Sequence, residues 1–213
     1  TPPAAPDMAE PPQKGERRKT LDDGFARLPR LDIVYKVPAG NTPDFYALSV
    51  LGQILGGGQS SRLYQKLVKD KQLALQVGSG AGERRGPSLE QVVAMVAPGK
   101  DMAEVEKTIY EEVERLKTEP VADWELQKVR LSIRRARAQM LQGTLMRAMM
   151  LGQYAVYYND PGLINTYEKK IGSITKDDIQ RVARTYLTSD NRTVITTVPK
   201  PPAAGARPSG AQL

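Results

Sequence analysis

The stretch LGQILGGGQSSRLYQKL, residues 51–67, decides how this chain is organised. It continues a segment that starts at Thr42-Pro43, where threonine can cap a helix and proline stands just inside it. Apolar residues recur at helical spacing over residues 45–55, until three consecutive glycines at 56–58 stop the helix. A serine pair then caps a second short helix over residues 62–71. We therefore predict two helices joined by a glycine loop.

Strands are predicted on both sides of this helical unit. Apolar runs and period-two alternation predict four of them, at residues 31–37, 73–81, 89–97 and 192–198, and the polar stretch at 16–21 is interpreted as an edge strand. The sequence GERRGP at 82–87 is typical of a turn and predicts an antiparallel hairpin. Helical spacing predicts further helices at residues 102–117, 122–158, 162–171 and 175–187. Strands at both ends with helices between them indicate an α+β fold, an antiparallel sheet layered with helices.

The composition limits the chemistry that this chain can perform. Its 213 residues include no histidine and no cysteine. Imidazole acid–base catalysis, thiolate nucleophiles, disulfides and the usual zinc ligands are therefore excluded. Lysine and arginine exceed aspartate and glutamate by seven, which favours anionic partners only if the excess gathers on one face. We expect a protein whose chemistry, if it has one, is supplied by another domain.

Composition also predicts the domain boundaries. Residues 1–14 and 200–213 are rich in proline, alanine and glycine, and we interpret them as a linker and a disordered tail. The folded domain is expected over residues 15–199. No apolar run is long enough to span a membrane. Because the chain opens at Thr1 without a methionine, we expect it to be a piece of a longer protein.

Two motifs are weighed against simpler readings. The glycine run could hold an anion on the following backbone N–H groups, but it lacks the Gly-Lys-Ser/Thr of a phosphate loop, so a plain turn is favoured. Residues 173–176 and 189–191 spell the Ser-x-x-Lys and Ser-Asp-Asn boxes of penicillin-recognising enzymes. The third box is missing, and Thr175 with Asp178 makes a capping box, so a helix start is favoured.

The long helix predicted at 122–158 suggests a rival function. Three arginines share one face, as in a nucleic-acid-binding helix: Arg130, Arg134 and Arg137. An apolar row runs beside them, so we interpret the arginines as a solvated face: Leu126, Val129, Ile133, Ala136 and Met140. Methionines and tyrosines follow, and we expect them in the core: Met146, Met149, Met150, Tyr154, Tyr157 and Tyr158. Binding of nucleic acid remains the alternative from another class.

The order of elements and the string at 51–67 resemble a known family. Supporting matches are Glu16-Arg17-Arg18, Tyr35-Lys36-Val37-Pro38, Lys71-Gln72-Leu73-Ala74 and Glu125. Over about residues 15–199 the chain is similar to the second, C-terminal domain of M16 zinc metallopeptidases, the pitrilysin, insulinase and mitochondrial processing peptidase family.

This resemblance implies a division of labour between two related α+β domains that close as a clamshell around a chamber. Zinc is expected in the partner, held by an inverted His-x-x-Glu-His motif and a downstream glutamate, with no cofactor in this chain. The chain is then a non-catalytic, peptide-enclosing domain that is inactive alone. The alternative is an inactive companion subunit of a separate catalytic subunit, in a homo- or hetero-oligomer. We expect a bacterial, periplasmic or otherwise extracytoplasmic protein.

The resemblance also bears on individual residues. Active members place an arginine and, seven residues later, a tyrosine against the substrate backbone. Those positions fall on Val68 and Leu75 here, so both polar groups are replaced. The remaining candidates for contact with a peptide are in and after the glycine loop: Gly57, Gly58, Ser60 and Arg62. For Arg62 a structural role is the alternative.

Overall fold

The alternating apolar rows meet in one five-stranded sheet. The computed structural model describes residues 11–200, and its strands follow the order β1-β5-β2-β4-β3. Their bounds are β1 Arg17–Asp23, β2 Arg30–Val37, β3 Ala74–Ala81, β4 Ser88–Val96 and β5 Arg192–Pro199. The pairs β2–β4, β2–β5 and β3–β4 are antiparallel, whereas β1 pairs with β5 in parallel. The α+β class is confirmed, with a mixed sheet whose parallel pair lies at one edge.

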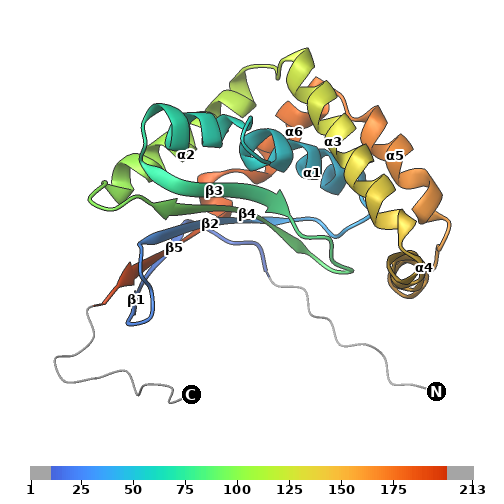
Figure 1. Ribbon diagram of the computed structural model, residues 1–213, viewed down its shortest axis with the longest axis horizontal. Coiled ribbons are helices and arrows are strands. Elements are labelled where there is room, and N and C mark those ends of the chain that lie inside the picture. Colours follow the sequence, from blue (N-terminus) through green and yellow to red (C-terminus); the bar gives the residue numbers. More distant parts are fainter. Residues whose placement is uncertain (1–10, 201–213) are drawn as a thin grey trace, which may run out of the picture.

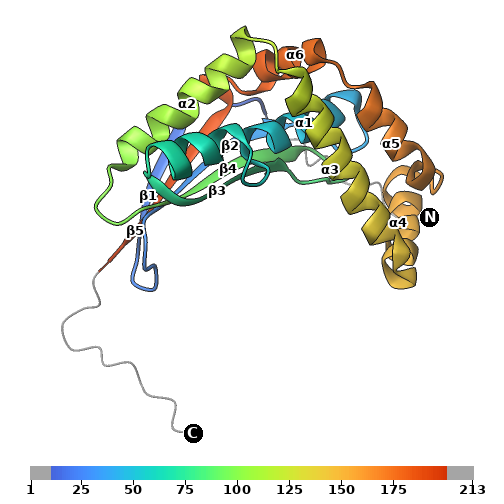
Figure 2. The same ribbon diagram turned by 45° about the horizontal axis from the view of Figure 1, so that its top comes forward.

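Helices cover one face of this sheet, as both views show (Figure 1, Figure 2). Their bounds are α1 Pro43–Gly56, η1 Tyr64–Asp70, α2 Met102–Thr118, α3 Asp123–Gln142, α4 Thr144–Tyr158, α5 Leu163–Ser173, α6 Lys176–Tyr186 and η2 Ser189–Asn191. The second helix of the opening stretch is a π-helix, η1. Within residues 11–200, no helix combines the length and apolar character that a membrane span requires.

The core lies between the sheet and the helices. The inward row of β2 is almost fully buried: Leu31, Ile33, Tyr35 and Val37. From the helical side, α1 contributes ten buried residues, because it is apolar nearly all round. Burial of these side chains supplies the main favourable free energy of folding.

Glycines bring α1 unusually close to β3. A Cβ atom at Gly52 would lie 2.9 Å from Gly80 Cα, and one at Gly56 would lie 2.4 Å from Ser79 N. No side chain fits at these distances, so the helix packs directly on the strand backbone. Gly56, the first residue of the glycine run, is therefore required by the packing of α1 on β3.

The other sheet face carries no helix in either view (Figure 1, Figure 2). Because directly opposed residues of an antiparallel pair share a face, Asp32, Val93 and Ile195 lie side by side on it. Val93 and Ile195 are partly exposed. We call this surface, formed by the outward residues of all five strands, the open face.

The helix predicted at 122–158 is two helices. Backbone dihedrals of φ −75° and ψ 125° at Gly143 break it into α3 and α4. The apolar row of α3 is buried at Leu126 and Val129 but exposed at Ala136 and Met140, because the helix runs past the core. The methionine and tyrosine cluster is likewise wrong as a core prediction. Only Tyr154 of its members is buried.

The arginines of α3 form a solvated face only in part, because Arg134 is exposed whereas Arg130 and Arg137 are not. Arg137 is 7% exposed, donates to the Tyr154 hydroxyl at 3.1 Å and stacks over the Tyr167 ring. Arg130 donates to the Ile174 carbonyl at 2.6 Å, and Arg134 pairs with Glu168 at 3.5 Å. These side chains join the arm of α3 and α4 to α5, so the prediction of a solvated stripe is wrong for Arg130 and Arg137 and holds for Arg134.

Both ends of the described chain lie on the sheet edge formed by β1 and β5. The Gln13 side chain donates to the Arg192 carbonyl at 2.7 Å, and Lys200 N donates to the Asp23 carbonyl at 2.9 Å. The boundaries at 14/15 and 199/200 stay predictions. The predicted linker and tail lie mostly outside the described residues, at 1–10 and 201–213.

Candidate functional site

The glycine loop is a rigid turn between α1 and η1. Gly58 has φ +81°, a left-handed conformation that favours glycine. Its carbonyl accepts both the N–H and the hydroxyl of Ser61, at 3.2 and 2.7 Å. The Gln65 side chain donates to the Gln59 carbonyl at 2.6 Å. These bonds fix the loop, so Gly57, Gly58 and Ser60 are presented on an ordered backbone.

A buried ion pair anchors the loop to α3. Arg62 Nε and Nη2 each donate to a carboxylate oxygen of Glu125 at 2.8 Å, and both side chains are largely buried. Glu125 also accepts the Ala122 N–H at 2.8 Å. Burial tends to raise the pKa of Glu125, but the hydrogen bonds from Arg62 and Ala122 hold it below its usual value. Arg62 thus has a structural role; its contact with a peptide stays a prediction.

Lys128 ties the loop to α3 from the outside. Its Nζ donates to the carbonyl and the hydroxyl of Ser60, both at 3.0 Å, and lies over the Trp124 ring. Burial lowers its pKa, an effect that Glu125 partly offsets. Between the glycine loop and α3 lies a depression of about 410 Å³. It is lined by glycine-loop residues and by Lys128 and Arg135, and no carboxylate is among its lining residues. Its charge suits an anionic group, such as a peptide carboxylate.

The two positions that we predict to replace the family's arginine and tyrosine differ in exposure. Val68 packs against the core. Leu75 is the extra residue of a bulge in β3, between Ala74 and Gln76, and is 56% exposed. A bulge turns a side chain away from the regular pleat. Leu75 is therefore an exposed apolar group whose side chain can make no hydrogen bond; that it stands at the family's tyrosine position stays a prediction.

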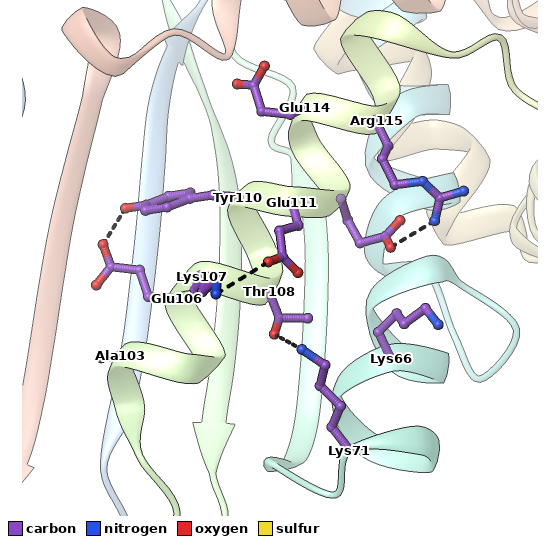
Figure 3. Close-up of a pocket in the computed structure, with 11 residues that line it drawn as sticks. Lys66, Lys71, Ala103, Glu106, Lys107, Thr108, Tyr110, Glu111, Glu114 and Arg115 are labelled. Carbon is purple, nitrogen blue, oxygen red and sulfur yellow. Dashed lines mark hydrogen bonds and ion pairs between the residues drawn. The ribbon is translucent and has the colours of Figure 1, made fainter.

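An open groove of about 950 Å³ lies along α2 beside η1 (Figure 3). Lys71 Nζ donates to the Thr108 hydroxyl at 2.9 Å, and Arg115 Nη1 donates to Glu112 Oε1 at 3.1 Å. Glu112 is buried, and within the described chain its Oε2 has no hydrogen-bond partner. Acidic and basic groups alternate around this groove, which suits contact with a charged peptide but supplies no nucleophile and base pair.

One buried carboxyl group escaped the sequence reasoning. Glu90 points between β4 and α1, accepts the Ser79 hydroxyl at 2.7 Å and leaves Oε2 without a partner within residues 11–200. Burial raises its pKa to about 8, although the Ser79 hydrogen bond opposes this. Its place in the inward row Ser88, Glu90, Val92 was visible in the period-two pattern.

The remaining motifs are local structure. Thr175 caps α6 reciprocally with Asp178, as predicted, and the Ser-Asp-Asn box forms the short helix η2. Among residues 11–200, no group of three or more acidic side chains could hold a metal ion. Among the described residues, the glycine loop, the Leu75 bulge and the groove along α2 are thus the candidate contact surfaces.

Comparison with known proteins places this architecture. The chain is 28% identical over 190 residues to the zinc protease PqqE of Helicobacter pylori, covering 89% of this chain and 43% of that protein. A protease structure from Helicobacter pylori superposes with a TM-score of 0.84 at 28% identity, over 92% of this chain and 47% of that one. The chain therefore spans less than half the length of these relatives.

A shorter structure matches almost end to end. It is described as the inactive peptidase domain of a zinc protease candidate from Bordetella parapertussis. Its TM-score is 0.75 at 28% identity, over 91% of this chain and 99% of that one. A family model described as the peptidase M16 inactive domain matches residues 1–133, more than half of the sequence. The chain belongs to the peptidase M16 inactive-domain family.

Proposed function

We propose that this domain forms one wall of a peptide-enclosing chamber, closed by a zinc-bearing M16 domain on the same polypeptide or on a catalytic subunit. In zinc proteases of this family the zinc belongs to the partner domain. The domain then contributes enclosure and contact area, and the partner contributes a zinc-polarised water. An extracytoplasmic location remains part of this proposal.

The observation that carries the proposal is the open face of the sheet. Val93 and Ile195 lie on it partly exposed, beside Asp32, which accepts bonds from Arg30 and Gln91. When one face of a sheet is exposed to solvent, that face is usually polar. A mixed apolar and hydrogen-bonding face is suited to an enclosed space, where an extended peptide offers both kinds of group.

The glycine loop and the Leu75 bulge extend this assignment. Ser60 exposes an ordered backbone beside the basic depression, which could receive a carboxylate of a peptide. Leu75 offers apolar area on the edge strand β3. We assign both to shaping the enclosure, since neither supplies a reacting group.

The test uses this chain together with its zinc-bearing M16 partner. The chain alone should contain no zinc and cleave no peptide, whereas the assembled pair should cleave a fluorogenic peptide. Val93→Arg places a charge on the open face and should lower kcat/KM at least tenfold. Zinc bound at one per chain, or full cleavage by the partner without this chain, would contradict the proposal.

A matched control separates enclosure from folding. Thr185→Arg adds the same side chain to an exposed site on α6, and Thr185 makes only a local bond to the Arg181 carbonyl. Its kcat/KM should equal that of the unsubstituted protein. Circular dichroism melts of both variants should overlap; loss of activity in both would remove the support for the open face.

Binding of nucleic acid is not favoured. Of the three arginines on which that alternative rested, Arg130 and Arg137 are bonded within the domain and Arg134 pairs with Glu168. Few cations of α3 are therefore left for phosphates. Whether the partner is a domain or a separate catalytic subunit depends on where the zinc motif is encoded.

A further inference from the structure

Helix α4 is apolar on both of its sides. Among its fifteen residues, Arg147 is the only charged one. One side rests on α3 and α5, and there Tyr154 is buried under Arg137. In both views α4 lies at the end of the molecule away from β1 and β5 (Figure 1, Figure 2). An apolar helix of this kind is normally surrounded by protein.

The outward side of α4 carries a regular stripe. Leu145, Met149, Gly152 and Val156 follow one another at intervals of four, three and four residues, which places them on one helix face. Leu145 is 71% exposed, Met149 58% and Val156 71%. A Cβ at Gly152 would meet nothing within 4 Å. This spacing, with a glycine in the middle, is the pattern by which one helix receives another closely.

The charge around the stripe restricts what can cover it. Residues 126–159 contain six basic residues and no acidic one. Arg130, Arg134 and Arg137 are engaged within the domain, but α4 itself carries Arg147 and no carboxylate. Two copies of this chain paired through α4 would bring these like charges together and offer them no carboxylate. An apolar surface with an acidic rim is complementary instead. A partner of different composition is therefore favoured over a second copy.

We propose that the stripe Leu145–Met149–Gly152–Val156 is a docking surface for the zinc-bearing M16 domain, which covers it with an apolar segment flanked by carboxylates. This inference rests on the proposed function and adds the surface through which the two halves join. The Helicobacter pylori relative leaves more than half of its length unmatched by this chain, which is room for such a domain.

The test measures association and protection together. The isolated chain is a suitable reagent, because the Bordetella parapertussis inactive domain, of which it covers 99%, was crystallised as a domain. Met149→Glu and Val156→Glu should each weaken binding to the zinc-bearing domain at least tenfold. Thr185→Glu, on α6, should leave the affinity unchanged. Amides of residues 144–158 should exchange more slowly in the complex than in the isolated chain.

The outcomes separate this inference from the proposed function. If the complex forms and cleaves peptide while the two stripe variants bind normally and residues 144–158 stay unprotected, the docking surface is refuted and the chamber proposal stands. If the unsubstituted chain neither binds nor supports cleavage, both are refuted. Self-association of the isolated chain that Met149→Glu abolishes would assign the stripe to a second copy. Binding to anionic phosphatidylserine vesicles that the same variant abolishes would assign it to a lipid surface, and either result overturns the proposal.

Discussion

Helices α1 and α4 have nearly the same length and are both apolar, yet the fold treats them in opposite ways. Of 14 residues in α1, ten are buried, whereas α4 buries one of 15. Each has a glycine within it, but Gly52 lies against the backbone of β3 and Gly152 faces open space. An apolar helix is normally surrounded by protein, and which element surrounds it depends on what lies opposite. For α1 it is this domain's own sheet.

The largest effect should come from breaking the buried ion pair between Arg62 and Glu125. Glu125→Ala leaves the Arg62 guanidinium buried without its carboxylate and should lower the free energy of unfolding by about 3 kcal/mol. Glu168→Ala breaks the exposed pair with Arg134 on the arm and should cost no more than about 0.5 kcal/mol. Urea unfolding of both variants gives the comparison; equal losses would remove the distinction between the two regions.

A methyl group at the α1–β3 contact is expected to have the next largest effect. Gly56→Ala would place Cβ 2.4 Å from the Ser79 amide nitrogen, so helix and strand must move apart. We expect a loss of about 2 kcal/mol in the free energy of unfolding, typical of overpacking in a core. Chemical denaturation measures it. A loss below the measurement error would show that α1 does not rest directly on β3.

Glu90, on β4, should make the stability of the domain depend on pH. Its pKa rises from 4.5 to about 8 on folding, so between these values the folded protein keeps a proton that the unfolded chain has released. Stability from this group is complete below pH 4.5 and declines as pH rises toward 8. Glu90→Gln removes the titration, so its free energy of unfolding should fall less than that of the unsubstituted protein between pH 5 and pH 8.

Urea midpoints of the unsubstituted protein and of Glu90→Gln, at pH 5 and pH 8, isolate this group, because all others titrate alike in both proteins. Glu111→Gln, on the exposed face of α2, is the control and should leave the pH dependence unchanged. Parallel pH profiles for the unsubstituted protein and Glu90→Gln would refute the buried, protonated carboxyl.

The smallest change in the free energy of unfolding, and one of opposite sign, is expected from a substitution in α4. Gly152→Ala adds a methyl group into open space and should stabilise the isolated domain by about 0.5–1 kcal/mol through helix propensity. If α4 docks closely through this glycine, the same variant should weaken the complex. Thermal melts measure the first effect and titration of the two domains the second. Destabilisation of the isolated domain would show that Gly152 is already covered.

The sequence pattern predicted the elements well and their surroundings less well. Alternation in residues 31–37 predicted β2 and its buried row, because a strand's inner face is visible as period two. Leu126 and Met140 belong to one apolar row, but only Leu126 reaches the core. Periodicity shows which face of a helix is apolar, but it does not show whether another element packs against that face. The same limit made the methionines of α4 a predicted core.

The candidate site was harder to predict than the fold. The glycine run correctly predicted a turn, because the left-handed backbone of Gly58 favours glycine. The Arg62–Glu125 pair joins residues 63 positions apart, and no local pattern encodes such a contact. Arg137 was predicted to be solvated because charge normally is; Tyr154 and Tyr167 shelter it instead.

The parallel pairing of β1 with β5 has a mechanical consequence. The chain enters the domain at Arg17 and leaves it at Pro199, which lie at opposite ends of this ladder. A pull on both ends therefore loads the two strands in shear, and their hydrogen bonds share the force instead of opening one by one. Single-molecule stretching from residues 13 and 200 should give a higher rupture force than stretching across the β3–β4 hairpin. A domain that is pulled through both of these ends would in this way resist unfolding.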